Sequence, residues 1–120
     1  MDTSILIQKV IERNEKFWNP RWLINYELEY KLLVEEARET IMAVTKKDKK
    51  EIIDGCIDVM FVAIWTLHKL GLTESQIVSA FNIVCESNMS KLWAWKDERW
   101  KVKKWEDFIE PDFTSIIETL

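Results

Sequence analysis

Glycine and proline are scarce in this chain of 120 residues, which contains two of each. Sandwiches and barrels need many tight turns, and these residues supply most of them, so an all-helical chain is expected instead of a large β fold. Hydrophobic residues make up 48% of the sequence, too large a share for a disordered chain. The length predicts a single domain over residues 1–120.

Long hydrophobic runs are also lacking. The longest, Val59 to Trp65, has seven residues, whereas a membrane helix needs about 20, so no membrane partner is expected. The first residues place an acid at position 2 and charges throughout, unlike a secretory signal, and we expect the chain to begin near Met1. The net charge of -4 disfavours a general nucleic-acid-binding protein.

Cysteine and histidine are rare as well. Cys56 and Cys85 lie far apart and outside any C-x-x-C pair, which disfavours a disulfide framework or a zinc site and predicts buried thiols in a reducing cytoplasm. The single histidine, His68, excludes a di-iron site, which needs Glu-x-x-His on two helices. At the end of a helix, His68 is expected to be a terminal cation or a surface group and not a catalyst.

Apolar residues recur at a helical period in four segments. The predicted helices cover about 5–17, 22–44, 51–70 and 73–90. Asn19-Pro20 ends the first, because proline disfavours helix in the preceding residue. The third is apolar on nearly every face around Val59, as in a helix surrounded by others, and Gly71 is its expected C-terminal cap. Thr73 and Gln76 form a capping box that opens the fourth.

The period changes after Leu92. Trp93 and Trp95 alternate before a charged turn, and Trp100 and Val102 alternate after it, which predicts a short β-hairpin. The tail from residue 110 to 120 is expected to form a short turn or helix. The predicted fold is therefore an all-α bundle of four to five helices with a short C-terminal β-hairpin. Its motif core is 22–92, followed by a Trp- and Lys-rich extension at 93–120.

Two of the predicted helices carry acids at spacings of three and four. Glu35, Glu36 and Glu39 share the second helix, and Glu51, Asp54 and Asp58 share the third. Like charges at these spacings share a face and repel, and Asp58 enters the most apolar stretch, where an unpaired carboxylate is costly to bury. Antiparallel packing would gather four of the acids around Mg²⁺ or Mn²⁺, which prefer oxygen ligands. The four are Glu36, Glu39, Asp54 and Asp58. On spacing alone, solvated helix faces explain the acids equally well.

Three segments, taken together and in order, carry a family resemblance. They are Leu33-Val-Glu-Glu-Ala-Arg-Glu39, Glu51-Ile-Ile-Asp-Gly-Cys-Ile-Asp-Val59 and Ser87-Asn-Met-Ser-Lys91. This set resembles the all-α nucleotide pyrophosphohydrolases, namely the MazG-like enzymes and their phosphoribosyl-ATP pyrophosphohydrolase relatives. Ile109-Glu-Pro-Asp-Phe113 is also similar to the Pro-Pro-Asp-Leu ending of some phage-type members.

The resemblance implies a ligand set. In that family E-x-x-E on one helix and E-x-x-D on the next hold Mg²⁺ against the triphosphate, and Glu36, Glu39 and Asp58 match three of these positions. Gly55 stands where the common pattern has its third Glu. Asp54 would then take that role, as in members with an Asp-Gly-x-x-Asp version, and whether Glu51 does so instead stays open. Gly55 itself fits close approach of either a partner helix or the ligand.

The resemblance also implies substrate contacts. Asn88 and Lys91 match the family's Asn-x-x-Lys, although without the resemblance a polar helix end explains them better. Glu35 is a candidate to orient or deprotonate the attacking water. Trp65 is expected in the core. Three other tryptophans, Trp18, Trp22 and Trp95, are candidates to stack on the base, with core packing or a solvated hairpin as the commoner roles.

The predicted function is a cytoplasmic Mg²⁺-dependent nucleoside triphosphate pyrophosphohydrolase, which converts an NTP or dNTP to the monophosphate and pyrophosphate in nucleotide house-cleaning. Phosphoribosyl-ATP or an alarmone is an alternative substrate within the same superfamily. The apolar third helix and the resemblance imply a homodimer or a dimer of dimers. The rival hypothesis is a non-catalytic helical interaction module with solvated acids and a partner-binding tryptophan-rich tail.

Overall fold

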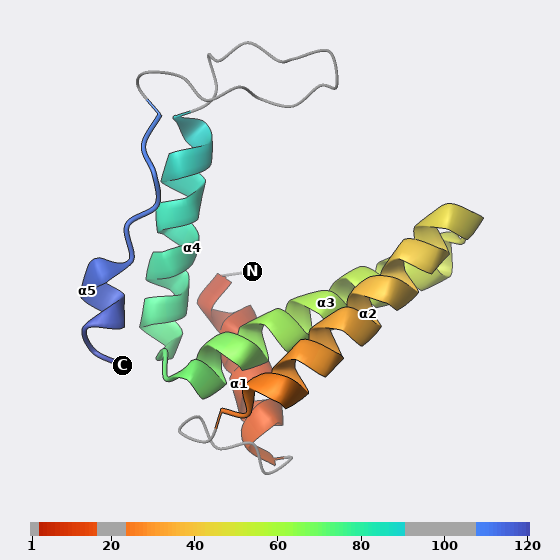
Figure 1. Cartoon of the computed structure of the whole chain (residues 1–120), viewed down its shortest axis with the longest axis horizontal. Coiled ribbons are helices and arrows are strands. Elements are labelled where there is room, and N and C mark those ends of the chain that lie inside the picture. The colour runs from red at the N-terminus through yellow and green to blue at the C-terminus, as the bar shows by residue number, and fades with distance from the viewer. Residues whose placement is uncertain (1–2, 17–23, 91–107) are drawn as a thin grey trace. The chain divides into compact units, whose positions relative to one another are not determined.

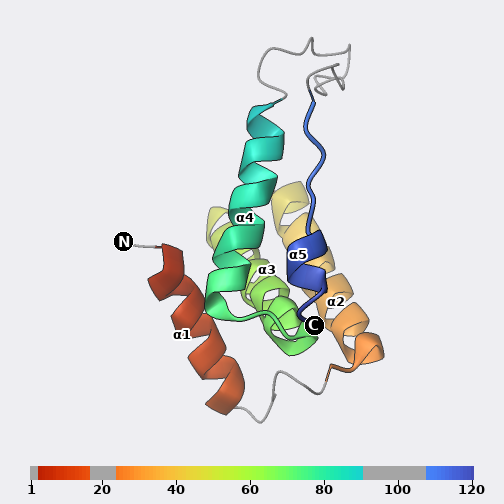
Figure 2. The ribbon, with the colours of Figure 1, turned by 90° about the vertical axis from the view of Figure 1, so that its left-hand side faces the viewer.

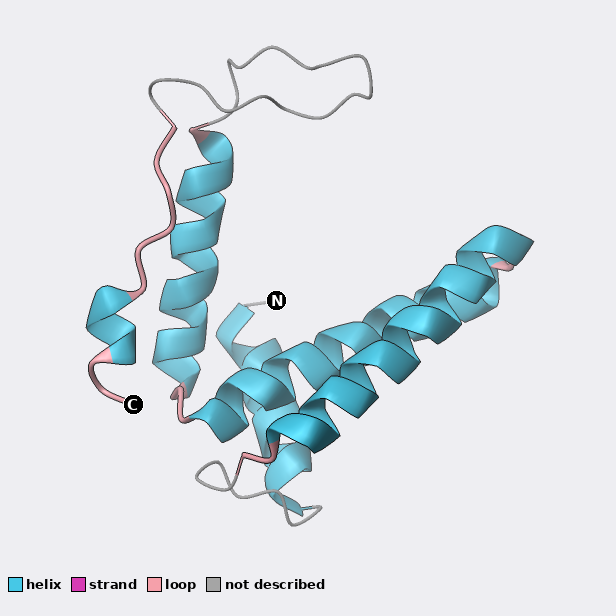
Figure 3. Ribbon diagram, viewed as in Figure 1, coloured by secondary structure: helices cyan, strands magenta, loops and turns pink. Residues whose placement is uncertain are grey.

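The computed structural model describes residues 3–16, 24–90 and 108–120, and every regular element within these ranges is a helix (Figures 1 and 3). The helices are α1 (Thr3–Lys16), α2 (Tyr26–Lys46), α3 (Lys49–Leu70), α4 (Glu74–Met89) and α5 (Thr114–Ile117). This confirms the predicted all-α class. The predicted β-hairpin at 93–102 lies outside the described residues. The chain divides into two compact units, Met1–Ile77 and Val78–Leu120.

In the first unit, α2 and α3 form a helical hairpin and run side by side (Figures 1 and 2). Asn25 caps the start of α2 by accepting a hydrogen bond from the Leu28 amide at 3.2 Å, so the helix begins four residues later than the Trp22 predicted from periodicity. Lys47 ends α2 in the left-handed conformation (φ 58°), and Asp48 caps α3 through the Glu51 amide at 3.1 Å. A two-residue connection therefore reverses the chain and makes the helices antiparallel.

Local sequence patterns correctly predicted the C-terminus of α3 and the N-terminus of α4. Gly71 closes α3 with φ 119°, a conformation that glycine adopts without steric cost. The capping box is present: the Thr73 amide donates to Gln76 Oε1 at 2.9 Å, and the Gln76 amide donates to Thr73 Oγ1 at 3.3 Å.

The helix α1 packs on α3, where Ile7 and Val10 are buried. The Trp65 indole N–H donates to the Val10 carbonyl at 3.0 Å, so this half-buried tryptophan ties the two helices together. His68 is at the end of α3 as predicted, but it is 4% exposed and not a surface group. Because α1 covers this end of α3, Glu15 Oε1 comes within 3.4 Å of His68 Nε2.

The expectation that both thiols are buried is wrong. Cys56 is an exposed free thiol and Cys85 a half-buried one, instead of both being buried. Successive helical residues are turned by about 100°, so Cys56 points away from α2 because the preceding Gly55 faces it. Within the first unit, α3 contacts both α1 and α2, and Met60 near its centre is 51% exposed.

The second unit contains most of α4 and the tail. The Ile109 amide donates to Ser90 Oγ at 3.0 Å, which joins the tail to the end of α4. Asp112 accepts from the Thr114 amide at 3.0 Å and from its hydroxyl, and these bonds lower the pKa of the Asp112 carboxyl. The short helix α5 follows, which confirms the predicted tail.

Among the described residues, no individual helix has the length and hydropathy needed to cross a membrane. The helices α3 and α4 meet that test of length and composition only when they are joined across the break between them.

Candidate active site

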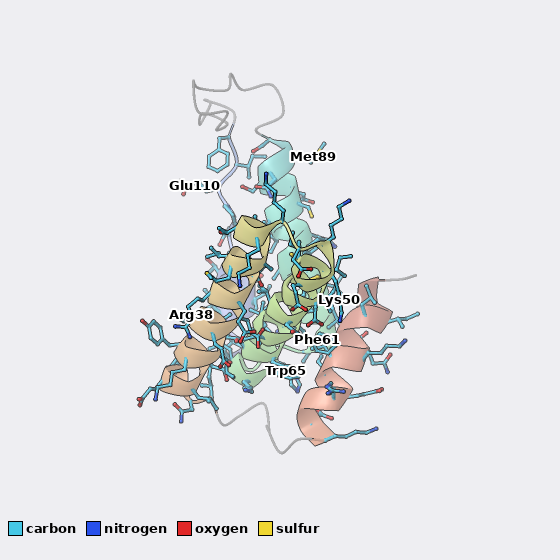
Figure 4. All side chains as sticks on the ribbon, turned by 90° about the vertical axis from the view of Figure 1, so that its right-hand side faces the viewer. Arg38, Lys50, Phe61, Trp65, Met89 and Glu110 are labelled. Carbon is cyan, nitrogen blue, oxygen red and sulfur yellow. The ribbon has the colours of Figure 1, made fainter. Side chains whose placement is uncertain are left out.

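A cavity of about 320 Å³ lies among the three helices of the first unit. Its lining consists of Arg13 from α1, Glu36 from α2, and Asp58, Phe61, Val62 and Trp65 from α3. Two predicted metal ligands from opposing helices, Glu36 and Asp58, therefore share one cavity. Figure 4 labels Phe61 and Trp65, which lie on the same helix as Asp58.

Glu36 has the most perturbed environment of the acids in this cluster. One of its carboxylate oxygens, Oε2, is fully enclosed and has no hydrogen-bond partner among the described residues. Burial raises the pKa of the Glu36 carboxyl, and the negative charges of Asp58, Glu39, Glu35 and Asp54 raise it further. Five of the six acids that the sequence singled out, Glu36 and the four acids that act on it, therefore form one electrostatic cluster.

The other acids that the sequence singled out differ in their exposure. Asp58 is half-buried, whereas Glu35, Glu39, Asp54 and Glu51 are exposed. Among the residues that the structure describes, no three His, Cys, Asp or Glu side chains are already arranged to hold a metal ion. The ligand set of Glu36, Glu39, Asp54 and Asp58 therefore stays a prediction.

The chemistry of the cluster nevertheless fits a hard divalent cation. Every candidate donor is a carboxylate oxygen, and Mg²⁺ and Mn²⁺ prefer such donors. The enclosed oxygen of Glu36 has no partner among the residues that the structure describes, and a carboxylate oxygen in such a position is stabilised by a cation or by protonation. Glu36 and Asp58, which line the same cavity, are the two residues best placed to share a divalent cation.

Gly55 lets the two helices approach closely beside this cluster. A Cβ atom built on Gly55 would lie 2.5 Å from Thr40 Oγ1 and 3.2 Å from Thr40 Cα, too close for any side chain without movement of α2. The Thr40 hydroxyl is itself fixed by donating to the Glu36 carbonyl at 2.7 Å. Of the two alternatives left open by the sequence, the structure supports the close approach of a partner helix.

A buried ion pair that the sequence did not predict joins the other end of the hairpin. Lys69 Nζ lies 2.6 Å from Glu29 Oε1, and both side chains are 4% exposed. The Thr66 hydroxyl donates to the second Glu29 oxygen at 2.8 Å, so both carboxylate oxygens are satisfied. Glu29 precedes Glu36 by two helical turns, which places both on the side of α2 that faces α3. This spacing was the feature of the sequence from which an inward-facing Glu29 could have been predicted.

Among the predicted substrate-binding residues, the structure describes Asn88. Asn88 is exposed near the end of α4 and belongs to the second unit. Lys91 lies outside the described residues, as do Trp18, Trp22 and Trp95. Their roles stay predictions.

The helical hairpin, its opposed carboxylates and the adjoining cavity are the features expected of an all-α nucleotide hydrolase. The model of the phosphoribosyl-ATP pyrophosphohydrolase family (PRA-PH) matches residues 3–84, which include α1, α2, α3 and most of α4. The chain belongs to this family and is a pyrophosphohydrolase by that membership. Neither the curated proteins nor the solved structures gave a match.

Proposed function

We propose that the protein hydrolyses the α–β phosphoanhydride bond of a nucleoside triphosphate, an NTP or dNTP, and releases the monophosphate and pyrophosphate. The observation that carries the proposal is the enclosed Oε2 atom of Glu36, which has no hydrogen-bond partner among the described residues, in a cavity that Glu36 shares with Asp58 from the opposing helix. Family membership supports the reaction type. Phosphoribosyl-ATP, which the family is named for, also contains an adenosine triphosphate and is an alternative substrate.

Mg²⁺, or Mn²⁺ in its place, would be held by Glu36, Glu39, Asp54 and Asp58. When bound, such an ion neutralises phosphate charge and makes a neighbouring water molecule more acidic. Glu35 would orient that water or take its proton. The water oxygen forms the new bond to phosphorus, the bridging P–O bond breaks, and pyrophosphate leaves. Asn88 and Lys91 would bind the sugar or phosphates by amide and ammonium hydrogen bonds.

Calorimetric titration with Mg²⁺ and a non-hydrolysable dNTP analogue tests this proposal. We expect metal-dependent binding by the wild-type protein and its loss in Asp58→Ala. The matched control is Glu27→Gln, which removes an exposed acid of α2 that pairs with Lys31 at 3.2 Å, away from the cavity. Absence of metal-dependent binding, or unchanged binding in Asp58→Ala, would instead support the non-catalytic interaction module.

The proposed assembly is a homodimer or a dimer of dimers, with a second copy covering the apolar face of the α2–α3 hairpin. Large apolar side chains are exposed along this hairpin, and examples are Tyr30 (68%), Ile41 (63%), Ile53 (67%) and Met60 (51%). Ile41 also lines an apolar groove of about 360 Å³ between the helices. Apolar surface along most of a hairpin is typical of a protein interface, and a two-fold axis lets one face cover itself.

A further inference from the structure

The cavity beside Glu36 has two chemically different parts. Asp58, Phe61, Val62 and Trp65 follow one another at i, i+3, i+4 and i+7, so they form one stripe along α3. At 1.5 Å per residue, the stripe runs about 10 Å from the carboxylate to the indole. An acidic end is therefore followed by an aromatic wall on one face of one helix.

The aromatic wall is fixed in place. Phe61 and Trp65 pack edge to face, with ring centroids 5.9 Å apart and an interplanar angle of 77°. The hydrogen bond of 3.0 Å from the Trp65 indole to the Val10 carbonyl orients the larger ring and holds α1 against α3. A preorganised aromatic surface of this kind binds a flat ring or a sugar at a low cost in entropy.

A positively charged side chain of α1 lies near this hydrogen bond. Arg13 is one turn beyond Val10 on α1, so the two residues lie on neighbouring parts of one helix face. Arg13 is the basic residue in the lining of the cavity, opposite the acids of α2 and α3. Its guanidinium stays charged at all relevant pH values and presents a planar fork that matches phosphate oxygens.

The volume bounds what the cavity can hold. Sites for small molecules have volumes of about 300–1,000 Å³, and a cavity of about 320 Å³ is at the lower end of this range. It accommodates part of a nucleotide, while the rest extends toward solvent and the exposed acids of the cluster.

We propose that this cavity is a nucleotide subsite in which Arg13 binds a phosphate oxygen and the Phe61–Trp65 wall contacts the nucleoside. The inference rests on the proposed function and extends it, because it gives α1, which carries none of the acidic motif, a direct part in substrate binding. The substrate phosphates would then meet carboxylate-held cations on one side and a guanidinium on the other.

Two variants separate the two parts of this subsite. Binding of a non-hydrolysable dNTP analogue and of inorganic tripolyphosphate, which has no nucleoside, is measured by calorimetry in Mg²⁺. We expect Arg13→Gln to weaken both ligands by about tenfold or more, because a hydrogen bond to a charged group contributes about 1.5–3 kcal/mol. Phe61→Leu should weaken only the analogue. Arg13→Lys should restore part of the loss, since it keeps the charge without the fork.

The matched control is Lys9→Gln, which removes one positive charge from an exposed position of the same helix outside the cavity lining. Equal affinities in Arg13→Gln and Lys9→Gln would overturn the role of Arg13. Equal losses for both ligands in Phe61→Leu would overturn the role of the aromatic wall. If the wild-type protein binds neither ligand, the proposed function fails and this inference fails with it.

Discussion

At the scale of single residues, Glu36 connects stability to function. Its pKa is raised by burial and by the charges of neighbouring acids, so the folded state holds the Glu36 proton more tightly than the unfolded chain does. Without divalent cations, this group therefore favours the fold below its ordinary value of 4.5, and that contribution is lost as the pH rises through the raised value. The same electrostatics that weaken the cation-free protein favour cation binding.

Replacing Glu36 with glutamine tests this link. In a chelating buffer at neutral pH, Glu36→Gln should raise the melting temperature, because it removes an enclosed charge that faces other acids. Added Mg²⁺ should then stabilise the wild-type protein more than the variant. Thermal melts followed by circular dichroism measure both effects, with Glu12→Gln on α1 as the control. A lower melting temperature for Glu36→Gln in chelator would contradict the unfavourable environment of Glu36.

Gly55→Ala is a second prediction at this scale. In a typical helix interior this change stabilises by about 1 kcal/mol. Here the added Cβ would lie 2.5 Å from Thr40 Oγ1, and overpacking of this kind costs about 1–3 kcal/mol, so we expect a net loss of stability. Urea unfolding of Gly55→Ala, with and without Thr40→Ala, measures it. The double variant should recover part of the loss, and a stabilised single variant would show that the helices can separate at no cost.

At the scale of helices, local sequence signals predicted more than long-range ones did. Gly71 and the Thr73–Gln76 box act over a few residues, and the helix ends they mark are confirmed. The predicted stop at Asn19-Pro20 lies outside the described residues. The start of α2 was predicted too early because the apolar period extends to residues before the N-cap, Asn25. The ion pair of Glu29 and Lys69 joins residues 40 positions apart, and the spacing that places Glu29 on the inner side of α2 does not specify its partner.

Breaking that ion pair should loosen the hairpin. Lys69→Met leaves the Glu29 carboxylate buried and unpaired, which costs about 3–5 kcal/mol. Glu29→Gln with Lys69→Met should cost less than Lys69→Met alone, because no charge remains unpaired. Chemical denaturation of both variants measures the difference. If the double variant is less stable than Lys69→Met alone, the unpaired Glu29 carboxylate is not the cause of the loss of stability in Lys69→Met.

At the scale of the whole molecule, the acidic cluster and the all-α class followed from periodicity and motif order. The exposure of individual side chains did not follow from them, since Cys56 was expected to be buried and is exposed. Periodicity records that a face is apolar without showing what covers it. The exposed apolar side chains of α2 and α3 lead to the prediction of a second copy.

That prediction is testable by solution mass. Ile41→Lys places a charge in the exposed apolar groove and should convert a dimer or larger assembly to a species of 14.4 kDa. Ile117→Lys is the control, because Ile117 is similarly exposed (61%) but lies on α5. Light scattering after size-exclusion chromatography gives the masses. A wild-type mass of one chain would contradict the proposed assembly.

The most direct test of the central claim is the product released from a panel of nucleotides, including dNTPs, NTPs and phosphoribosyl-ATP, in the presence of Mg²⁺. We predict that at least one yields pyrophosphate and the nucleoside monophosphate. The rate should fall by about 100-fold or more in Glu39→Ala and Asp58→Asn, as when transition-state charge stabilisation is removed, but not in Glu27→Gln. Release of single phosphates, no turnover of any nucleotide, or an unchanged rate in Asp58→Asn would contradict the account.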